Sequence, residues 1–89
     1  METVHLLISG KVQGVFFRQT AVSMAQTLHI TGWIKNTQDA KVEALVTGTS
    51  GDITSFINWC ETGPERANVE SVVISKQPEI TFKKFEVLK

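Results

Sequence analysis

The stretch from Gly10 to Arg18, GKVQGVFFR, holds the residue types and spacing in this chain that best suit a chemical task. It lies between an alternating apolar run and a helical pattern, so the chain passes there from a strand into a helix. Backbone N–H groups at such a junction are unpaired, and the helix N-terminus adds partial positive charge. The guanidinium of Arg18 supplies a planar fork of donors suited to a tetrahedral oxyanion. The stretch therefore predicts a phosphate-binding loop.

The other reactive side chains indicate no second site. Cys60 falls on the apolar stripe of a helical pattern and is interpreted as a buried, small hydrophobic residue, because no histidine shares a motif with it. His5 and His29 belong to different elements, with no carboxylate or cysteine at ligand spacing, so no metal site is expected. Asn36, taken alone, is an ordinary turn residue.

Hydrophobic periodicity places the loop between the first strand and the first helix. Apolar residues alternate from Val4 to Ile8, which predicts a half-buried strand. Apolar residues then recur at helical spacing from Phe17 to Leu28, which predicts a helix. We expect this helix to stop near Thr31 and Gly32, where Gly32 would relieve the turn.

The remaining elements follow from the same patterns and from turn residues. In chain order we expect a short strand at 32–35, a polar turn at 36–40, a strand at 42–46, a helix whose apolar stripe runs over 53–60 and which stops at Gly63–Pro64, and strands at 69–75 and 82–88. The order β-α-β-β-α-β with a short terminal strand predicts an α+β, ferredoxin-like two-layer sandwich. Its sheet is expected to be antiparallel, with both helices on one face.

Composition limits the class of protein. The 89 residues are 42% hydrophobic and 20% charged, which is typical of a globular chain, and we expect one domain over residues 1–89. The net charge of +0 argues against binding of nucleic acid through an extended basic surface. A single cysteine fits a reducing compartment, and no apolar run reaches membrane-spanning length. A cytoplasmic protein without a membrane segment is expected.

Two segments resemble the signatures of a known family. The stretch GKVQGVFFR at 10–18 is similar to the first signature of the acylphosphatases, and GWIKN at 32–36, followed by Val42 and Gly48, is similar to the second. Gly63–Pro64 and the pair Phe82 and Phe85 add to this resemblance, which extends over essentially the whole chain.

The resemblance implies a small hydrolase that splits the carboxyl-phosphate anhydride of an acyl phosphate into a carboxylate and inorganic phosphate. It implies a monomer that uses no metal and no cofactor, with a small-molecule acyl phosphate as its substrate. The catalytic residues that it implies are Arg18, which binds the phosphate, and Asn36, which positions the attacking water. The backbone of the loop would form the phosphate cradle, through Gln13, Gly14, Val15, Phe16 and Phe17.

One position departs from the family pattern. Ala40 stands in the connection between the second and third strands, where these proteins usually carry glycine. If the backbone there has a positive φ, alanine costs about 1 kcal/mol relative to glycine. Asn36 begins the same turn, so its placement depends on that conformation.

Two other functions remain open at this point. The first is a catalytically weak phosphate- or anion-binding module that keeps the cradle for regulation. The second is an RNA-binding domain, because RNA-recognition domains share this topology and stack bases on aromatic side chains. Phe16 and Phe17, however, lie at a strand-to-helix junction rather than within a central strand, which disfavours RNA binding.

Overall fold

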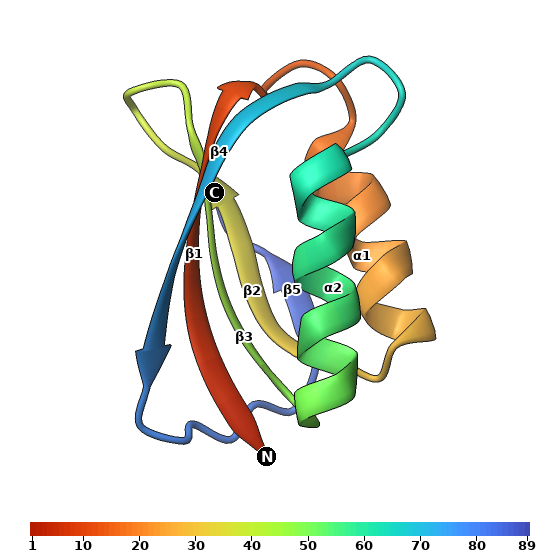
Figure 1. The fold of residues 1–89 in the computed structure, drawn as a ribbon, viewed down its shortest axis with the longest axis vertical. Coiled ribbons are helices and arrows are strands. Elements are labelled where there is room, and N and C mark those ends of the chain that lie inside the picture. Colours follow the sequence, from red (N-terminus) through yellow and green to blue (C-terminus); the bar gives the residue numbers. More distant parts are fainter.

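The computed structural model describes residues 1–89 and packs two helices against one face of a five-stranded sheet (Figure 1). The elements are β1 (Glu2–Lys11), α1 (Phe17–Thr27), β2 (Thr31–Asn36), β3 (Val42–Gly48), α2 (Ser50–Thr62), β4 (Asn68–Gln77) and β5 (Phe85–Val87). The spatial order of the strands is β4-β1-β3-β2-β5. Neither helix has the length and apolar character that crossing a bilayer requires.

The predicted ferredoxin-like sandwich is confirmed, with one addition at the edge of the sheet. β4, β1, β3 and β2 pair with their neighbours in antiparallel fashion. β5 pairs with β2 in parallel, with Val87 beside Ile34, so the complete sheet is mixed. β5 is also shorter than the strand expected over 82–88. After β4 the chain crosses to the opposite edge of the sheet, and this crossing brings the C-terminal residues beside β2.

The hydrophobic core lies between the sheet and the two helices. Strand alternation sends Leu6 and Ile8 of β1 and Ile34 of β2 toward the helices, and all three side chains are fully buried. α1 faces them with Ala21 and Ala25, which are also fully buried. Because residues four apart share one helix face, these small side chains let α1 lie close to the sheet.

The turn that follows α1 differs from the prediction. The turn out of the helix is made by His29, which has a left-handed φ of 55°, whereas Gly32 already lies inside β2. The N–H of Ile30 donates to the carbonyl of Ala25 at 2.8 Å, and the N–H of His29 donates to that of Gln26 at 3.3 Å. These two bonds form a Schellman motif with histidine at the position that glycine usually takes.

The end of α2 at Gly63 agrees with the prediction, and a side chain caps its start. The hydroxyl of Thr49 accepts a hydrogen bond from the N–H of Asp52 at 3.2 Å, and Gly63 ends the helix with a φ of 70°. Trp59 of α2 packs on Phe17, the first residue of α1, with ring centroids 5.1 Å apart. This contact fixes the start of α1, where the loop between β1 and α1 ends.

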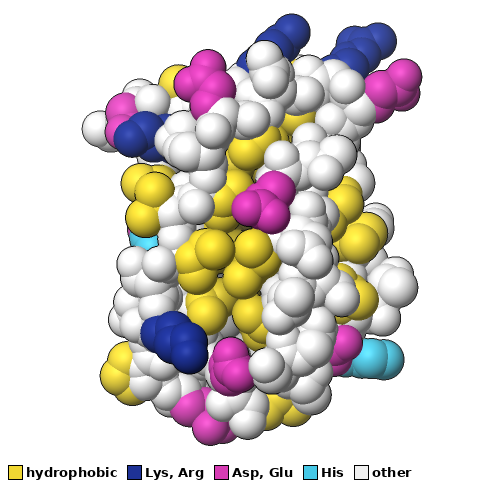
Figure 2. Space-filling view, viewed as in Figure 1, with side chains coloured by type: hydrophobic (Ala, Val, Ile, Leu, Met, Phe, Trp, Pro, Cys, Tyr) yellow, Lys and Arg dark blue, Asp and Glu magenta, His cyan; other side chains and the backbone are white.

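The surface mixes charges of both signs, as the zero net charge requires (Figure 2). In the view of Figure 2, hydrophobic side chains gather over the seam between β4 and α2. β4 is an edge strand, and the side chains of Val73 and Ile74 on it are exposed.

Candidate functional site

The loop between β1 and α1 presents backbone N–H groups that have no acceptor. None of the N–H groups from Val12 to Phe16 donates a hydrogen bond within the protein. The first helical bond of α1 runs from the N–H of Thr20 to the carbonyl of Phe16 at 3.1 Å, so the N–H groups of residues 17–19 have no partner in the helix. No side chain caps this helix end. Such a run of free donors at a helix N-terminus attracts an anion.

Apolar side chains anchor this loop by packing into the hydrophobic core. Val12, Val15 and Phe17 are buried in the core, whereas Gly14 and Phe16 between them are exposed. Gly14 and Phe16 both have positive φ angles, of 72° and 64°. A Cβ added at Gly14 would meet no atom within 4 Å, so packing does not explain the glycine. The positive φ of Gly14 explains why glycine stands there, and the lack of a side chain leaves the backbone open to a ligand.

Arg18 lies in the first turn of α1, beside these free N–H groups. Its side chain is half-buried, and no carboxylate lies within ion-pair distance of it. The guanidinium donors are therefore available to a ligand. An arginine of this kind binds a phosphate through two parallel hydrogen bonds.

Asn36 is the last residue of β2, opposite Val42 of β3 on the helix-facing side of the sheet. Its Oδ1 is the only buried side-chain nitrogen or oxygen atom in the protein without a hydrogen-bond partner. A buried polar atom without a partner costs about 1–3 kcal/mol of stability. The fold therefore gains nothing from an asparagine at this position, which points to a role in binding or catalysis.

One cavity of about 490 Å³ brings most of the predicted site residues together. It is lined by Val12, Gly14, Phe16, Phe17, Arg18, Gln19, Asn36 and Val87. Of the seven residues singled out from the sequence, only the side chains of Gln13 and Val15 lie outside this lining. Sequence reasoning missed Val12, Gln19 and Val87. Val87 reaches the cavity because β5 pairs with β2, and no local sequence pattern predicts that pairing.

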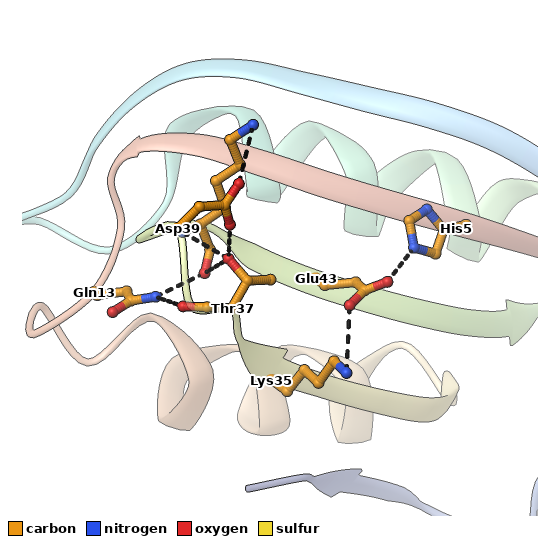
Figure 3. A network of polar contacts seen from close by, with 7 residues as sticks. His5, Gln13, Lys35, Thr37, Asp39 and Glu43 are labelled. Carbon is orange, nitrogen blue, oxygen red and sulfur yellow. Dashed lines mark hydrogen bonds and ion pairs between the residues drawn. The ribbon is translucent and has the colours of Figure 1, made fainter.

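The side chain of Gln13 has a task that the sequence did not suggest. Its Nε2 donates to the main-chain carbonyls of Thr37 and Lys41, both at 2.9 Å (Figure 3). These two residues form the turn between β2 and β3, which the N–H of Thr37 closes by donating to the carbonyl of Lys41 at 2.9 Å. Gln13 thus joins the loop to the hairpin that carries Asn36.

The same turn contains the residue that departs from the family pattern. Ala40 has a φ of 67°, so the left-handed conformation considered for this position is present. Around it, the Thr37 hydroxyl accepts a hydrogen bond from the N–H of Lys41 at 3.0 Å and donates one to the carboxylate of Asp39. The Thr37 bond lowers the pKa of Asp39. These contacts hold the turn in its conformation although alanine disfavours it.

The other titratable groups with shifted pKa values lie away from the cavity. On the sheet face that carries no helix, His5 Nε2 donates to Glu43 at 2.7 Å and Lys35 lies 3.6 Å from it, and these contacts lower the pKa of Glu43 (Figure 3). Burial raises the pKa of the Cys60 thiol, as expected for a packed hydrophobic residue. No group of three His, Cys, Asp or Glu side chains is placed to hold a metal ion. Arg18 is thus the one charged side chain in the cavity lining.

Comparison with known proteins identifies what this chain resembles. The family model for acylphosphatase matches residues 4–87. An acylphosphatase of Bordetella parapertussis is 42% identical over 79 residues, which cover 89% of this chain and 84% of the relative. The structure of an acylphosphatase from Coxiella burnetii superposes with a TM-score of 0.94 at 34% identity, covering 98% of this chain and 92% of the other. That from Bacillus subtilis superposes with a TM-score of 0.96 at 26% identity, with both chains covered completely.

Proposed function

The chain belongs to the acylphosphatase family, hydrolases that act on acyl phosphates, and on this premise we propose that the cavity between β1, α1 and β2 is its active site. The reaction converts an acyl phosphate into a carboxylate and inorganic phosphate. The observation that carries the assignment is that Arg18, Asn36 and the loop with free N–H groups border one cavity.

The loop and Arg18 hold the phosphoryl group. Main-chain N–H groups from Gln13 to Phe17 surround its oxygens, and the guanidinium of Arg18 binds two of them. In phosphoryl transfer, negative charge is spread over the equatorial oxygens of the transition state, and catalysis consists mostly of positioning and electrostatic stabilisation. Donors that are fixed before the substrate arrives stabilise that charge without further rearrangement.

Asn36 holds the attacking water. An amide has negligible basicity, but it carries both a donor and an acceptor and so orients a water molecule. The water oxygen forms a new bond to phosphorus while the bond from phosphorus to the acyl oxygen breaks, and the electron pair of that bond leaves with the carboxylate. The proton of the water passes to a phosphate oxygen of the substrate. A carboxylate is a good leaving group, so no general acid is needed, and the cavity lining offers none.

The direct test is release of phosphate from benzoyl phosphate in the presence of a chelator. The wild type should hydrolyse it, and Arg18→Ala should lose both turnover and the affinity for inorganic phosphate. Arg18→Lys should recover little activity, with a kcat/KM about a hundredfold below that of the wild type. Lysine keeps the positive charge but lacks the planar guanidinium that donates two parallel hydrogen bonds. Arg66→Lys, at the only other arginine, is the matched control and should behave as the wild type. Normal turnover of Arg18→Ala would refute the assignment.

The same proposal includes the state and the place in which the protein acts. We propose a monomer, because the residues assigned to the site lie together within one chain and need no second copy to complete it. The one cysteine is buried and unpaired, which supports a reducing, cytoplasmic setting. The zero net charge supports a small-molecule substrate rather than a nucleic acid. Light scattering during size-exclusion chromatography should give the mass of one chain, 9.9 kDa.

A further inference from the structure

The cavity is much larger than the group that Arg18 and the loop would hold. Its volume is about 490 Å³. A water molecule takes up about 30 Å³ of the liquid, so a phosphate with its five heavy atoms fills on the order of 100 Å³. Most of the cavity is thus left for the acyl part of the substrate.

Phe16 is placed in a way that the fold does not explain. Its side chain is 65% exposed, and its φ of 64° is unusual for a bulky residue. A left-handed conformation costs a residue with a side chain about 1–2 kcal/mol. The neighbouring Phe17 supplies the aromatic ring that the core needs, with only 2% of it exposed. Strain and exposure together, at the rim of a cavity, indicate a function for the ring of Phe16.

Val87 supplies a second apolar surface in the same cavity. It lies in β5 beside Ile34 and is 40% exposed. The N–H of Leu88 donates to the carbonyl of Ile34 at 2.9 Å, which fixes this part of the chain against β2. A side chain on such a strand offers a rigid surface, and its exposed area is free to be buried by a ligand.

We propose that Phe16 and Val87 form an apolar subsite for the acyl group, so that acyl phosphates with a larger aromatic or aliphatic acyl chain are favoured over those with a small one. This inference rests on the proposed function. The phosphate is held by the loop and Arg18, and the acyl chain then lies along Phe16 and Val87. Burying the exposed area of these two side chains adds affinity for larger apolar acyl groups.

The test compares benzoyl phosphate with acetyl phosphate, which has the same reacting group and a smaller acyl chain. The measured quantity is the ratio of the two kcat/KM values. The wild type should favour benzoyl phosphate. Phe16→Asn and Val87→Thr should each lower the ratio about three- to tenfold, as for the loss of one aromatic or branched apolar contact. Asparagine tolerates a positive φ, and threonine has nearly the shape of valine, so both variants keep the backbone.

Two controls make the result specific. Phe16→Leu retains an apolar side chain and should keep most of the ratio. Val73→Thr repeats the valine substitution on the exposed edge strand β4 and should leave the ratio unchanged.

Two outcomes would overturn the inference, and only the second would also overturn the proposed function. An unchanged ratio in both Phe16→Asn and Val87→Thr, with both substrates still hydrolysed, would refute the apolar subsite and leave the proposed function intact. If the wild type hydrolysed neither substrate, the proposed function would fail, and the subsite with it.

Discussion

Gln13 and Lys41 are 28 positions apart in the chain and are joined by a hydrogen bond of 2.9 Å from the side-chain amide of Gln13 to the main-chain carbonyl of Lys41. The same amide donates to the carbonyl of Thr37. One side chain therefore sets the distance between the loop that would bind the phosphate and the hairpin that would hold the water. The core cluster also contains residues of both segments, which are Val12 and Val15 of the loop and Ile34 and Val42 of the hairpin. Gln13, however, makes the only side-chain hydrogen bonds between the two segments.

Replacing Gln13 by leucine removes both donors at nearly constant volume. We expect kcat to fall about tenfold or more, because a shift of about 1 Å between reacting groups has large kinetic effects. The free energy of unfolding should fall by about 1 kcal/mol for the lost bonds. Gln38→Leu, on the same turn but without a side-chain hydrogen bond, is the matched control. Turnover of Gln13→Leu equal to that of the control would show that the two hydrogen bonds of Gln13 have no catalytic role.

Asn36→Ala should separate turnover from stability. If Asn36 positions water, kcat falls by about two to three orders of magnitude, while the inhibition constant of inorganic phosphate stays within about twofold of the wild-type value. The free energy of unfolding should not fall, because the buried Oδ1 that is lost has no partner. A loss of phosphate affinity in proportion to kcat would instead make Asn36 a phosphate ligand.

Ala40→Gly should stabilise the protein by about 1 kcal/mol, since glycine adopts the positive φ of this position without strain. Urea denaturation measures the change. Ala67→Gly, at an alanine with an ordinary φ, should destabilise and serves as the comparison. If Ala40→Gly also destabilised, the hydrogen bonds of Thr37 would hold the turn without strain at Ala40.

Glu43→Gln should change how stability depends on pH. The pKa of Glu43 is lowered in the folded protein, first by the hydrogen bond from His5, so its carboxylate form stabilises the fold. That contribution is complete above the ordinary value of 4.5 and is lost as the pH falls through the lower folded value. The difference in unfolding free energy between wild type and variant should be no more than about 1 kcal/mol near pH 6 and should shrink toward pH 3. A difference that grows in acid would contradict the shift.

Local signals in the sequence were enough for the loop and for most of the fold. The alternation before Gly10 and the helical spacing after Phe17 predict the junction, because both patterns arise from the chain's own periodicity. Gly63 likewise marks the end of α2 by its backbone freedom. The residue that makes the turn after α1 was predicted wrongly, because His29 rather than Gly32 takes the left-handed conformation there.

The rest of the site depends on contacts between distant parts of the chain. Gln13 looks like one more polar loop residue until the hairpin turn at 37–41 stands beside it. Val87 enters the cavity through the parallel pairing of β5 with β2, which follows from where the chain returns after β4. The unpartnered oxygen of Asn36 is likewise visible only when its neighbours are in place.

If the free N–H groups of the loop bind phosphate as proposed, the folding equilibrium of the protein depends on the concentration of that ligand. A ligand that binds only the folded state adds stability that grows with the logarithm of its concentration. Under the proposed assignment, substrate and inorganic phosphate present the same oxygens to these donors, so the product competes with the substrate for one site. The stability of the folded chain would then rise with the phosphate concentration around it.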